Sequence, residues 1–442
     1  MIGKKVLYIF IIIVTAIISC YLLIYSFLPT NISIVKDNKS NITIPIPFKL
    51  YVKNANMEYE NVIHLNGNKI TDKFAELDPS QTITVFSDEL GEFLLEIKLF
   101  GFLPLKTLKV NVIPEIKVYP GGQAIGVLLK SKGIMVVGCS YVENENGQRY
   151  YPGENAGIEI GDKILEVDGR EINDKYKLLD HIQKYKGNKD ITFKIQKKNG
   201  RTKIIKLSPI KNKYGNYMIG LYIDDGVAGV GTLSFYDSQS KEYAALGHLI
   251  TESTAGMKVD VRTGHIVEAN ISGISGGREG LPGEKLGTFF QTQNILGNIE
   301  TNNDFGIYGK LIKKPEIKNN FFDKALPVAV RSSVEIGPAQ MYTVVEGNRI
   351  EEFDVYIEKI YHQHVPASKS MVIRITDPEL NKLTGGIVQG MSGSPLVQNN
   401  MLIGAVTHVF INNPQRGYGV FAEWMIKNLE NYNDHSRAKK AS

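Results

Sequence analysis

The chain has 442 residues, a formal net charge of +5 and 43% hydrophobic residues, and its 42 glycines are distributed over many segments. This length exceeds one ordinary hydrophobic core and predicts several folded domains, while the scattered glycines exclude a low-complexity chain. The positive charge is weak and forms no basic stripe interleaved with aromatics, which argues against nucleic acid as a partner.

An uncharged apolar run from Val6 to Leu28 follows Lys4 and Lys5 at the N-terminus. As a helix, its 23 residues would span roughly 34 Å, more than the ~30 Å hydrocarbon core of a bilayer. The lysines precede the run and no basic cluster directly follows it, so the positive-inside rule predicts a cytoplasmic N-terminus and an external remainder. A cleaved signal peptide is the alternative, but such peptides have a shorter apolar part and a small-x-small cleavage site, which SFLPT lacks. We therefore expect residues 1–29 to form a retained transmembrane anchor.

Residues 30–115 have the pattern of short strands. Runs such as TITVF, EFLLEIKLF and LKVNVI are rich in Val, Ile, Leu and Phe, and Asn, Gly, Pro and Asp separate them. The sequence predicts a small β-sandwich-like domain without a chemical motif, and a spacer or docking role for it.

Residues 116–209 combine strands with one helix. The stretch DKYKLLDHIQKYKG has helical periodicity, with Asn173 or Asp174 as its N-cap, and strand-like runs lie on both sides. Together with the segment GIEIGDKILEVDGREI, which begins at Gly157, this order of elements resembles a PDZ domain of the bacterial protease type.

In PDZ domains an extended peptide adds beside the second strand, and backbone N–H groups of the preceding loop hold its C-terminal carboxylate. The resemblance implies that this loop is Ala124, Ile125, Gly126 and Val127, and that the domain takes a peptide ligand. The alternative is that Ile125 and Val127 are buried strand residues.

Residues 210–430 return to short strands and Gly-rich turns with one helix near the end, and a basic tail follows over residues 431–442. This pattern fits one large β-barrel unit or two smaller ones packed together. The sharpest motif in this region is GMSGSP, in which Ser392 lies in a glycine turn just before a predicted β-hairpin.

A serine hydroxyl is a poor nucleophile, so it needs a base beside it and N–H donors for the oxyanion that forms. The setting of Ser392 resembles the chymotrypsin-like nucleophile, whose motif is Gly-Asp-Ser-Gly-Gly-Pro, with Met391 and Ser394 as departures. The Asp that Met391 replaces pairs with the new N-terminus of activated zymogens, which an anchored chain does not need. An α/β-hydrolase elbow is rejected because a hairpin and not a helix follows the serine. The expected oxyanion hole is the backbone N–H groups of Gly390 and Ser392.

His248 is the expected general base, because it ends the small-residue strand YAALGH in the way the histidine of chymotrypsin-like enzymes does. Asp377, at the end of the apolar run MVIRIT, is the expected acid and gives the order His, Asp, Ser that this class requires. Asp260 and Asp354 are the alternatives, and a simple Asp-Pro turn is the structural explanation of Asp377. The expected fold is thus mainly β, with a transmembrane helix, a β-sandwich-like domain, a PDZ domain and a chymotrypsin-like double β-barrel.

His408 lies on the strand where this class builds its primary specificity pocket. A histidine there would favour Glu or Gln before the scissile bond, and a buried structural histidine is the alternative. The sequence shows no phosphate loop, metal-spaced cluster or other cofactor motif, so no cofactor is expected.

Four segments carry a more specific resemblance: GHLITES, LPGEKLG, GGIVQGMSGSPLVQNNMLIGAVTHVF and GYGVFAEWM. Behind an anchor and a PDZ domain, they resemble the stage IV sporulation protein B serine peptidases of endospore-forming bacteria, over roughly residues 116–430. The resemblance implies His248 as base and Ser392 as nucleophile, and it supports Asp377 as the acid.

The resemblance also implies a biological role. Such proteins are made in the forespore, cross its membrane, cleave themselves and cut a regulatory partner of an intramembrane metalloprotease, which triggers processing of a late sigma factor. The implied partners are protein substrates, a second copy in trans, a PDZ peptide ligand and the membrane, with the catalytic domain facing the intermembrane space. Two other classes remain open: a non-catalytic PDZ scaffold, and a quality-control protease of the HtrA kind, although that family places its PDZ domains after the protease.

Overall fold

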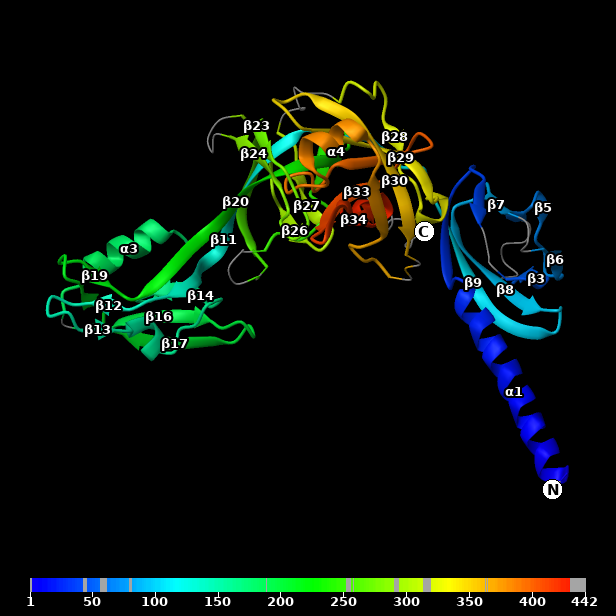
Figure 1. Ribbon diagram of the computed structural model, residues 1–442, viewed down its shortest axis with the longest axis horizontal. Helices are drawn as coiled ribbons and strands as arrows, with labels where there is room; N and C mark the ends of the chain where they lie inside the picture. The colour runs from blue at the N-terminus through cyan, green and yellow to red at the C-terminus, as the bar shows by residue number, and fades with distance from the viewer. Residues whose placement is uncertain are drawn as a thin grey trace.

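The computed structural model describes residues 2–42, 46–55, 62–78, 82–187, 189–251, 256, 258–289, 294–312, 319–361, 363 and 365–429. Figure 1 shows an elongated molecule with a helix and a small β domain at one end, a body of two barrels in the middle and an arm at the other end. Strands dominate each of these units, so the chain is mainly β, as expected. The expected basic tail over residues 431–442 lies outside the described residues.

The N-terminal unit consists of one long apolar helix and a two-sheet domain. Helix α1 (Ile2–Phe27) contains the stretch Lys5–Phe27, which is long and apolar enough to cross a membrane. The two sheets have the orders β1-β9-β8-β3-β6 and β2-β7-β4-β5 and share one apolar core, to which β8 and β9 contribute alternate residues. The strands are β1 (Asn31–Val35), β2 (Ser40–Ile42), β3 (Leu50–Asn54), β4 (Ile63–Leu65), β5 (Asn68–Lys69), β6 (Ala75–Leu77), β7 (Ile83–Ser87), β8 (Gly91–Leu99) and β9 (Leu103–Ile113).

The first barrel of the central body is built around strands β11, β22, β25, β27, β21 and β20, which pair in that order except between β25 and β27. There, a bridge between Gly297 and Leu311 brings β25 to the end of β27, so the six strands surround one core. The strands of this unit are β10 (Lys117–Pro120), β11 (Ala124–Cys139), β20 (Leu221–Tyr236), β21 (Glu242–Ala245), β22 (Val261–Glu268), β23 (Asn270–Ser275), β24 (Glu284–Thr288), β25 (Ile295–Asn298), β26 (Thr301–Asn303), β27 (Gly306–Lys310) and β28 (Leu326–Pro327).

The second barrel is closed, with the strand order β29-β30-β31-β34-β33-β32. A short 3₁₀ turn η2 precedes it, helix α4 lies between β31 and β32, and helix α5 follows β34. The elements are η2 (Arg331–Ser333), β29 (Gly337–Val344), β30 (Ile350–Ile360), β31 (Met371–Ile375), α4 (Pro378–Thr384), β32 (Pro395–Gln398), β33 (Met401–Phe410), β34 (Asn413–Phe421) and α5 (Ala422–Ile426).

The N-terminal domain contacts the second barrel through polar groups of β1. The guanidinium Nη2 of Arg331 donates to the carbonyl of Asn31 (2.8 Å), and the hydroxyl of Ser332 donates to the carbonyl of Ser33 (2.9 Å). The hydroxyl of Ser33 also donates to the carboxylate of Glu423 in α5 (3.2 Å). The N-terminal domain is therefore connected to the body on the side of α5.

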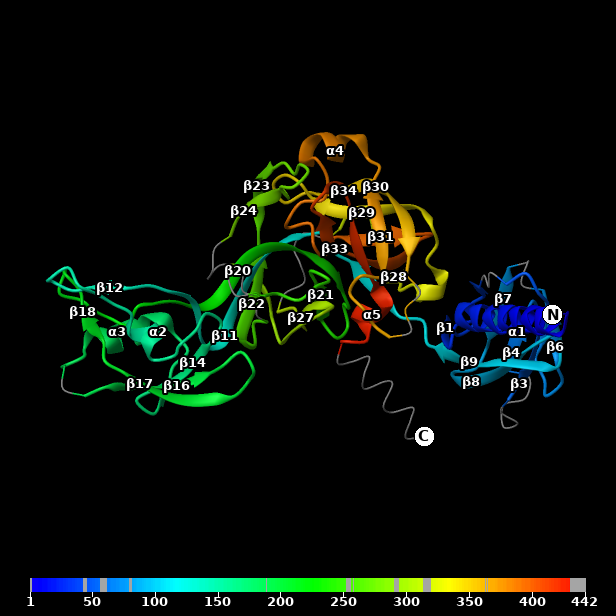
Figure 2. The same ribbon diagram turned by 60° about the horizontal axis from the view of Figure 1, so that its bottom comes forward.

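The arm is inserted into the first barrel and does not precede it. Strands β11 and β20 pair with each other both in the barrel, where Ala124 opposes Thr232, and in the arm, where Met135 opposes Asp224. Figure 2 shows both strands running from the arm into the body. The expected boundary at residue 116 therefore does not separate the two units, because the first half of β11 pairs with β22 in the barrel. An apolar strand without a turn signal gives no indication of which sheet it joins.

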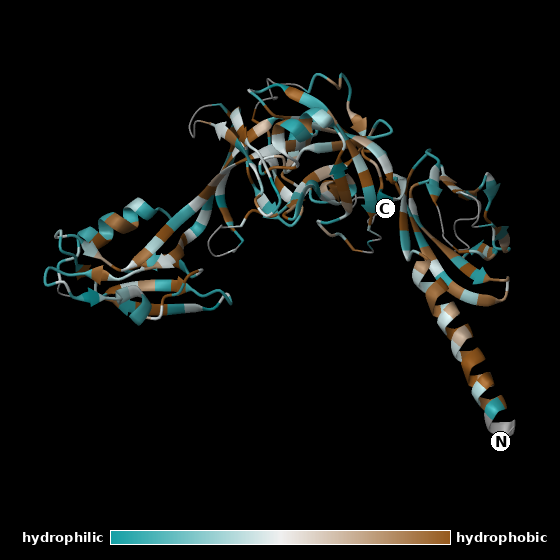
Figure 3. Ribbon diagram, in the orientation of Figure 1, coloured by the Kyte–Doolittle hydropathy of each residue, from teal (hydrophilic) through white to brown (hydrophobic). Residues whose placement is uncertain are grey.

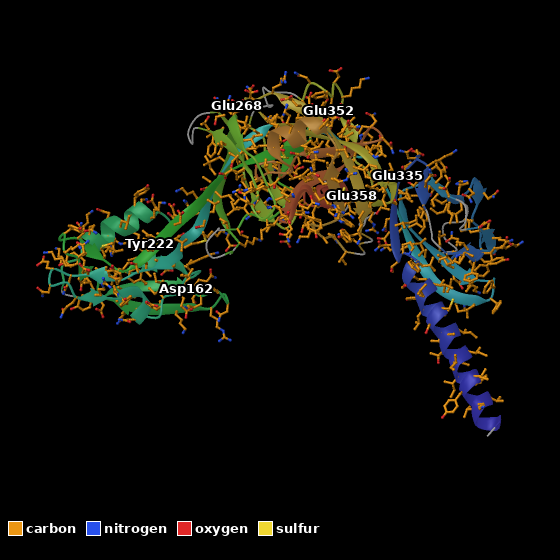
Figure 4. All side chains as sticks on the ribbon, in the orientation of Figure 1. Asp162, Tyr222, Glu268, Glu335, Glu352 and Glu358 are labelled. Carbon is orange, nitrogen blue, oxygen red and sulfur yellow. The ribbon has the colours of Figure 1, made fainter. Side chains whose placement is uncertain are left out.

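The arm contains two short helices and several short strands around its own apolar core. Its longer helix is capped by Asp174, whose carboxylate accepts from the N–H groups of Tyr176 and Lys177, so the expected cap is present. Asp162, labelled in Figure 4, is fully buried and accepts from the amine of Lys197 (2.7 Å). The elements are β12 (Val142–Glu143), β13 (Arg149–Tyr150), α2 (Pro152–Asn155), β14 (Lys163–Val167), β15 (Arg170–Glu171), α3 (Lys175–Gln183), β16 (Ile191–Gln196), β17 (Thr202–Leu207), β18 (Ile210–Lys211) and β19 (Tyr217–Met218).

Candidate active site

The turn that carries Ser392 comes directly before β32 and depends on two glycines. Gly390 and Gly393 have φ of +92° and +95°, which L side chains rarely adopt. A Cβ atom at Gly393 would lie 2.5 Å from the backbone nitrogen of Leu246 and would collide with the carbonyl oxygen of Thr232. The turn of the second barrel is thus pressed against strand β20 and the end of β21 in the first barrel.

Two contacts from Thr232 hold this turn against β20. The hydroxyl of Thr232 donates to the carbonyl of Gly390 (2.7 Å), and its backbone N–H donates to the carbonyl of Ser392 (3.0 Å). Thr232 is fully buried, so both hydrogen bonds are shielded from water. One residue of the first barrel therefore holds the turn on both sides of Met391.

Two backbone N–H groups of the turn are left without an internal acceptor. Met391, Gly393 and Ser394 donate to the carbonyls of Val388, Val406 and Met391, respectively. Within the described part of the chain, the N–H groups of Gly390 and Ser392 have no such partner. These are the two donors expected to form the oxyanion hole, and they are the ones free to bind an oxyanion.

His248 follows a turn with unusual backbone angles at the end of β21. Leu246 and Gly247 both have φ of +70°. The Nδ1 atom of His248 lies 2.9 Å from the carbonyl oxygen of Leu249, and since a carbonyl only accepts, Nδ1 carries the proton and Nε2 is left as the acceptor. Burial lowers the pKa of His248, which favours the neutral base.

The segment after His248 is fixed by a buried asparagine in β26. The side-chain amide of Asn302 donates to the carbonyls of Ile250 (2.9 Å) and Val259 (3.0 Å), and its oxygen accepts from the N–H of Ile250 (2.8 Å). Asn302 thus closes the loop that begins at the catalytic candidate, and it escaped sequence reasoning because a lone Asn in a strand-like run carries no signal.

Strand β33 brings the serine and histidine turns together. The hydroxyl of Ser392 donates to the carbonyl of Thr407 (2.7 Å), and a Cβ atom at Gly247 would lie 3.0 Å from the methyl carbon of Thr407. The next residue, His408, has its ring centroid 4.9 Å from that of His248. In this conformation, none of the described contacts joins Ser392 directly to His248, because the serine hydroxyl is bonded to Thr407.

His408 is exposed and is not the buried structural histidine considered as the alternative. Its edge is open to solvent, but its ring packs against that of His248, and the resulting desolvation lowers its pKa to about 4, with the charges of His248 and Lys369 adding to this effect. His408 is therefore neutral at ordinary pH and lies beside the candidate base, at the open side of the site.

The structure does not bring Asp377 to His248. The carboxylate of Asp377 caps helix α4 by accepting from the N–H of Leu380 (2.8 Å). Asp354 lies next to Asp377, accepting with its carbonyl from the N–H groups of residues 376 and 377. Asp260 pairs with Lys163 (2.5 Å), at the edge of a cavity of about 500 Å³ between the arm and the first barrel. Among the residues described, no carboxylate contacts His248.

Residues Ala124, Ile125, Gly126 and Val127 do not form a peptide-binding loop. They lie inside β11, pair with β20 on one side and β22 on the other, and are buried. Their backbone N–H and C=O groups are hydrogen-bonded to the two neighbouring strands, so no N–H group is left to bind a carboxylate. The alternative interpretation, that Ile125 and Val127 are core strand residues, is correct, and the proposed loop was wrong.

A buried lysine packs against the turn that carries Ser392 and was missed by sequence reasoning. Lys285 in β24 is only 4% exposed, and its amine donates to the hydroxyl of Thr343 (2.7 Å), which also accepts from the hydroxyl of Ser394 (2.9 Å). Its aliphatic stem lies against Gly390. Burial lowers the pKa of Lys285 to about 7, and no carboxylate in the described part of the chain pairs with it. Lys285 belongs to the segment LPGEKLG, which sequence analysis noted only for its family resemblance, without a role for the lysine.

Two six-stranded barrels with a serine turn and a histidine turn meeting between them are the architecture of chymotrypsin-like serine peptidases. A family model described as SpoIVB peptidase S55 matches residues 215–426, and a PDZ domain model matches residues 136–207. These two matches support a SpoIVB-type serine peptidase that contains a PDZ domain. The PDZ match covers most of the arm and omits residues 124–127.

Two solved structures of Rv3671c were also found, both 14% identical in sequence and both covering 46% of this chain. One is an inactive mutant form from M. tuberculosis H37Rv, with a TM-score of 0.24 over 82% of that chain. The other is an inactive form of the Rv3671c protease, with a TM-score of 0.23 over 84% of that chain. These values are too low to transfer any property to this chain.

Proposed function

We propose that the chain is a membrane-anchored serine endopeptidase in which Ser392 is the nucleophile and His248 the general base. The observation that carries the assignment is the meeting of the two turns at Thr407, with the N–H groups of Gly390 and Ser392 free beside the serine. Neutral His248 with a free Nε2 has the protonation state that a base requires.

The chemistry follows from these positions. The Ser392 hydroxyl turns from Thr407 to His248, attacks the scissile carbonyl and gives its proton to Nε2, while the carbonyl oxygen becomes an oxyanion bound by the two free N–H groups. The imidazolium then protonates the leaving amine, and the acyl group remains on Ser392 as an ester. Water, deprotonated by His248, hydrolyses this ester and restores the hydroxyl.

The hydrogen bond from Ser392 to Thr407 corresponds to a resting state. An extended substrate lying along β33 would donate its own backbone N–H to the Thr407 carbonyl and thereby displace the serine hydroxyl. Substrate binding would then free the nucleophile to reach His248. Nδ1 of His248 is held by the Leu249 carbonyl, so the imidazole needs no carboxylate partner, and Asp377 serves as the cap of helix α4.

The packing at the end of α1 supports a retained anchor over a cleaved signal peptide. Ile24 and Leu28 are only 4% and 0% exposed because they belong to the apolar core of the N-terminal domain. Cleavage after the helix would remove these side chains from that core and cost stability. We therefore infer a single-pass protein with its N-terminus in the cytoplasm and its catalytic barrels outside.

The biological role rests on the family resemblance. We infer that the protein cleaves itself in trans, that it cuts a regulator of an intramembrane metalloprotease during sporulation, and that it acts from the forespore membrane toward the intermembrane space. The PDZ domain would bind a peptide that targets or restrains this cleavage.

A fluorophosphonate probe tests the catalytic assignment without a known substrate. The full chain in lipid nanodiscs is labelled, digested and analysed by mass spectrometry, alongside Ser392→Ala, His248→Ala and the exposed control Ser275→Ala. We expect labelling of Ser392 in the wild type and in the control, and at least about 10³-fold slower labelling in His248→Ala.

Self-cleavage is followed on the same samples by gel electrophoresis. Fragments in the wild type and the control, with intact Ser392→Ala and His248→Ala chains, support the peptidase and its self-cleavage. Cleavage of Ser392→Ala after the wild type is added to it would support activity in trans. Absence of labelling in every sample would favour the non-catalytic PDZ scaffold, and fragments in all four would indicate a contaminating protease.

A further inference from the structure

The turn between β8 and β9 exposes a cluster of aromatic rings. Phe102 is 74% exposed, Phe100 52% and Phe48 36%. The ring centroids of Phe100 and Phe102 are 6.4 Å apart, and those of Phe48 and Phe100 are 5.7 Å apart. We call these three residues the hairpin-tip cluster.

The backbone of this turn makes the exposed rings more unusual. Phe102 N–H closes the turn on the carbonyl of Leu99 (3.3 Å), and the two central residues, Phe100 and Gly101, have φ of +54° and +80°. Hairpin turns of this geometry normally carry Asn-Gly, since Asn tolerates positive φ and a bulky aromatic residue is strained there. Phe100 thus combines a strained backbone with an apolar ring that is exposed to water. Contact of this ring with an apolar environment would offset the cost of both features.

Helix α1 shows where that environment lies. The hydroxyl of Tyr21 donates to the carbonyl of Pro104, just after the hairpin turn (2.9 Å). Tyr21 belongs to the apolar stretch Lys5–Phe27, six residues or about 9 Å before its end. Figure 1 shows the β8–β9 hairpin curving toward the side on which α1 leaves the domain, and Figure 3 shows that helix as mostly hydrophobic.

Lys106 marks the other boundary of this region. Its amine donates to the carbonyl of Leu28 (2.8 Å) and lies 4.6 Å from the ring centroid of Tyr25. A lysine beside interfacial tyrosines at the end of an apolar helix is typical of the headgroup level of a bilayer. Along β9, the chain from Lys106 back to Phe102 therefore leads from the headgroup level toward the acyl chains.

We propose that the hairpin-tip cluster inserts into the boundary between headgroups and acyl chains of the membrane that α1 crosses. This proposal rests on α1 being the membrane anchor in the proposed function. A helix alone leaves the domain free to rotate about its axis and to tilt, whereas a helix and an inserted hairpin together fix its orientation. Through the contacts of β1 with Arg331 and Ser332, the same insertion sets the height of the second barrel above the membrane.

Tryptophan fluorescence in nanodiscs tests the insertion directly. Phe102→Trp is compared with Tyr214→Trp, because Tyr214 is equally exposed (77%) but lies in the arm. The wild type supplies the background of Trp424, the one tryptophan of the chain, which is buried. We expect brominated lipids to quench the added emission of Phe102→Trp at least about twofold and to leave Tyr214→Trp unchanged, in neutral and in anionic discs alike.

A second variant separates insertion from folding. Phe100→Asn with Phe102→Ser restores the preferred turn sequence, so this variant should melt at or above the wild-type temperature. In nanodiscs, insertion should protect residues 99–104 of the wild type from hydrogen exchange, and the variant should lose this protection. Equal quenching of the two tryptophan variants, with the protein still in the disc, overturns the insertion and leaves the anchor standing. Loss of the chain from the discs would overturn the anchor itself. Protection that appears only on adding a second protein or at high chain concentration would assign the cluster to a protein partner.

Discussion

The two barrels provide the two halves of the proposed catalytic pair in different ways. In the second barrel, Ser392 lies on a turn that two left-handed glycines form and that Thr232 and the chain Lys285–Thr343–Ser394 hold in place. In the first barrel, His248 is held by one backbone carbonyl and is tuned by burial. The comparison indicates that packing and hydrogen bonds fix the position of Ser392, whereas burial sets the proton affinity of His248.

The largest expected effect comes from disturbing the position of the serine. In Gly393→Ala, the added methyl group would collide with Thr232 and Leu246 and impose strain at positive φ, so the turn has to move. A displacement of about 1 Å at a reacting group costs roughly 100-fold in rate, and we expect at least that loss in the rate of fluorophosphonate labelling.

Gly273→Ala is the matched control, because its added methyl group meets nothing within 4 Å. Labelling of Gly393→Ala at the wild-type rate would show that the turn is adaptable and would remove the contrast between the two halves.

Lys285→Met tests the buried amine under the turn. Lysine has an ordinary pKa of 10.5, and burial lowers that of Lys285 to about 7. Between these values the unfolded chain binds a proton that the folded chain does not, so the stability of the fold rises with pH from 7 to 10.5. Below pH 7 the cost of burying the charge is fully present, at most about 5 kcal/mol.

We therefore expect Lys285→Met to melt at a higher temperature than the wild type at pH 6, with the gap closing by pH 10. Its labelling rate should nevertheless fall about tenfold, since the amine that orders Thr343 and Ser394 is gone. The exposed Lys382→Met serves as control and should change neither quantity. A variant that is less stable than the wild type at every pH would show that the amine is a net stabiliser.

The dependence of stability and labelling rate on acidic pH tests the role assigned to His248. Burial lowers the pKa of both His248 and His408, that of His408 to about 4. The unfolded chain therefore binds more protons between pH 6.5 and 4, and the fold loses stability as the pH drops through this range. We expect the labelling rate to stay high down to a pH below 6.5, where His248 becomes protonated.

His408→Gln removes one of the two titrating groups. It should lessen the fall in melting temperature between pH 7 and pH 4.5 and leave the acid limb of the labelling rate in place. If the acid limb of the pH profile of labelling shifts in His408→Gln, then His408, and not His248, is the group that controls the rate.

Sequence reasoning proposed Ser392 and His248 because each carries a local signal, a glycine turn before a hairpin and a small-residue strand ending in histidine, and the structure places these two turns close to each other at β33. The same reasoning proposed the N–H groups of Gly390 and Ser392 as the oxyanion hole, and neither group has a backbone acceptor in the described part of the chain. The order of the units was also predicted, apart from the insertion of the PDZ domain into the first barrel.

The remaining features depend on pairings between distant segments. Residues 124–127 form an apolar run that fits a PDZ loop and a barrel strand equally well, and only β20 and β22 decide between them. The contact of Lys285 with the serine turn forms only when β24 packs against the second barrel, so the sequence does not reveal it. Short-range patterns predict strands and turns, whereas long-range pairing determines which of them share a core.

The smallest expected effect concerns Asp377. Its carboxylate caps α4, and an asparagine side chain can accept the same hydrogen bond from Leu380 without carrying a charge. We expect Asp377→Asn to keep the wild-type melting temperature and a labelling rate within about threefold, and Asp377→Ala to lose about 1 kcal/mol of stability with the cap. If Asp377→Asn melts normally but labels 100-fold more slowly, the negative charge itself is needed for catalysis. The carboxylate would then have to leave the helix and reach His248 during turnover, and the histidine side would be as strictly positioned as the serine side.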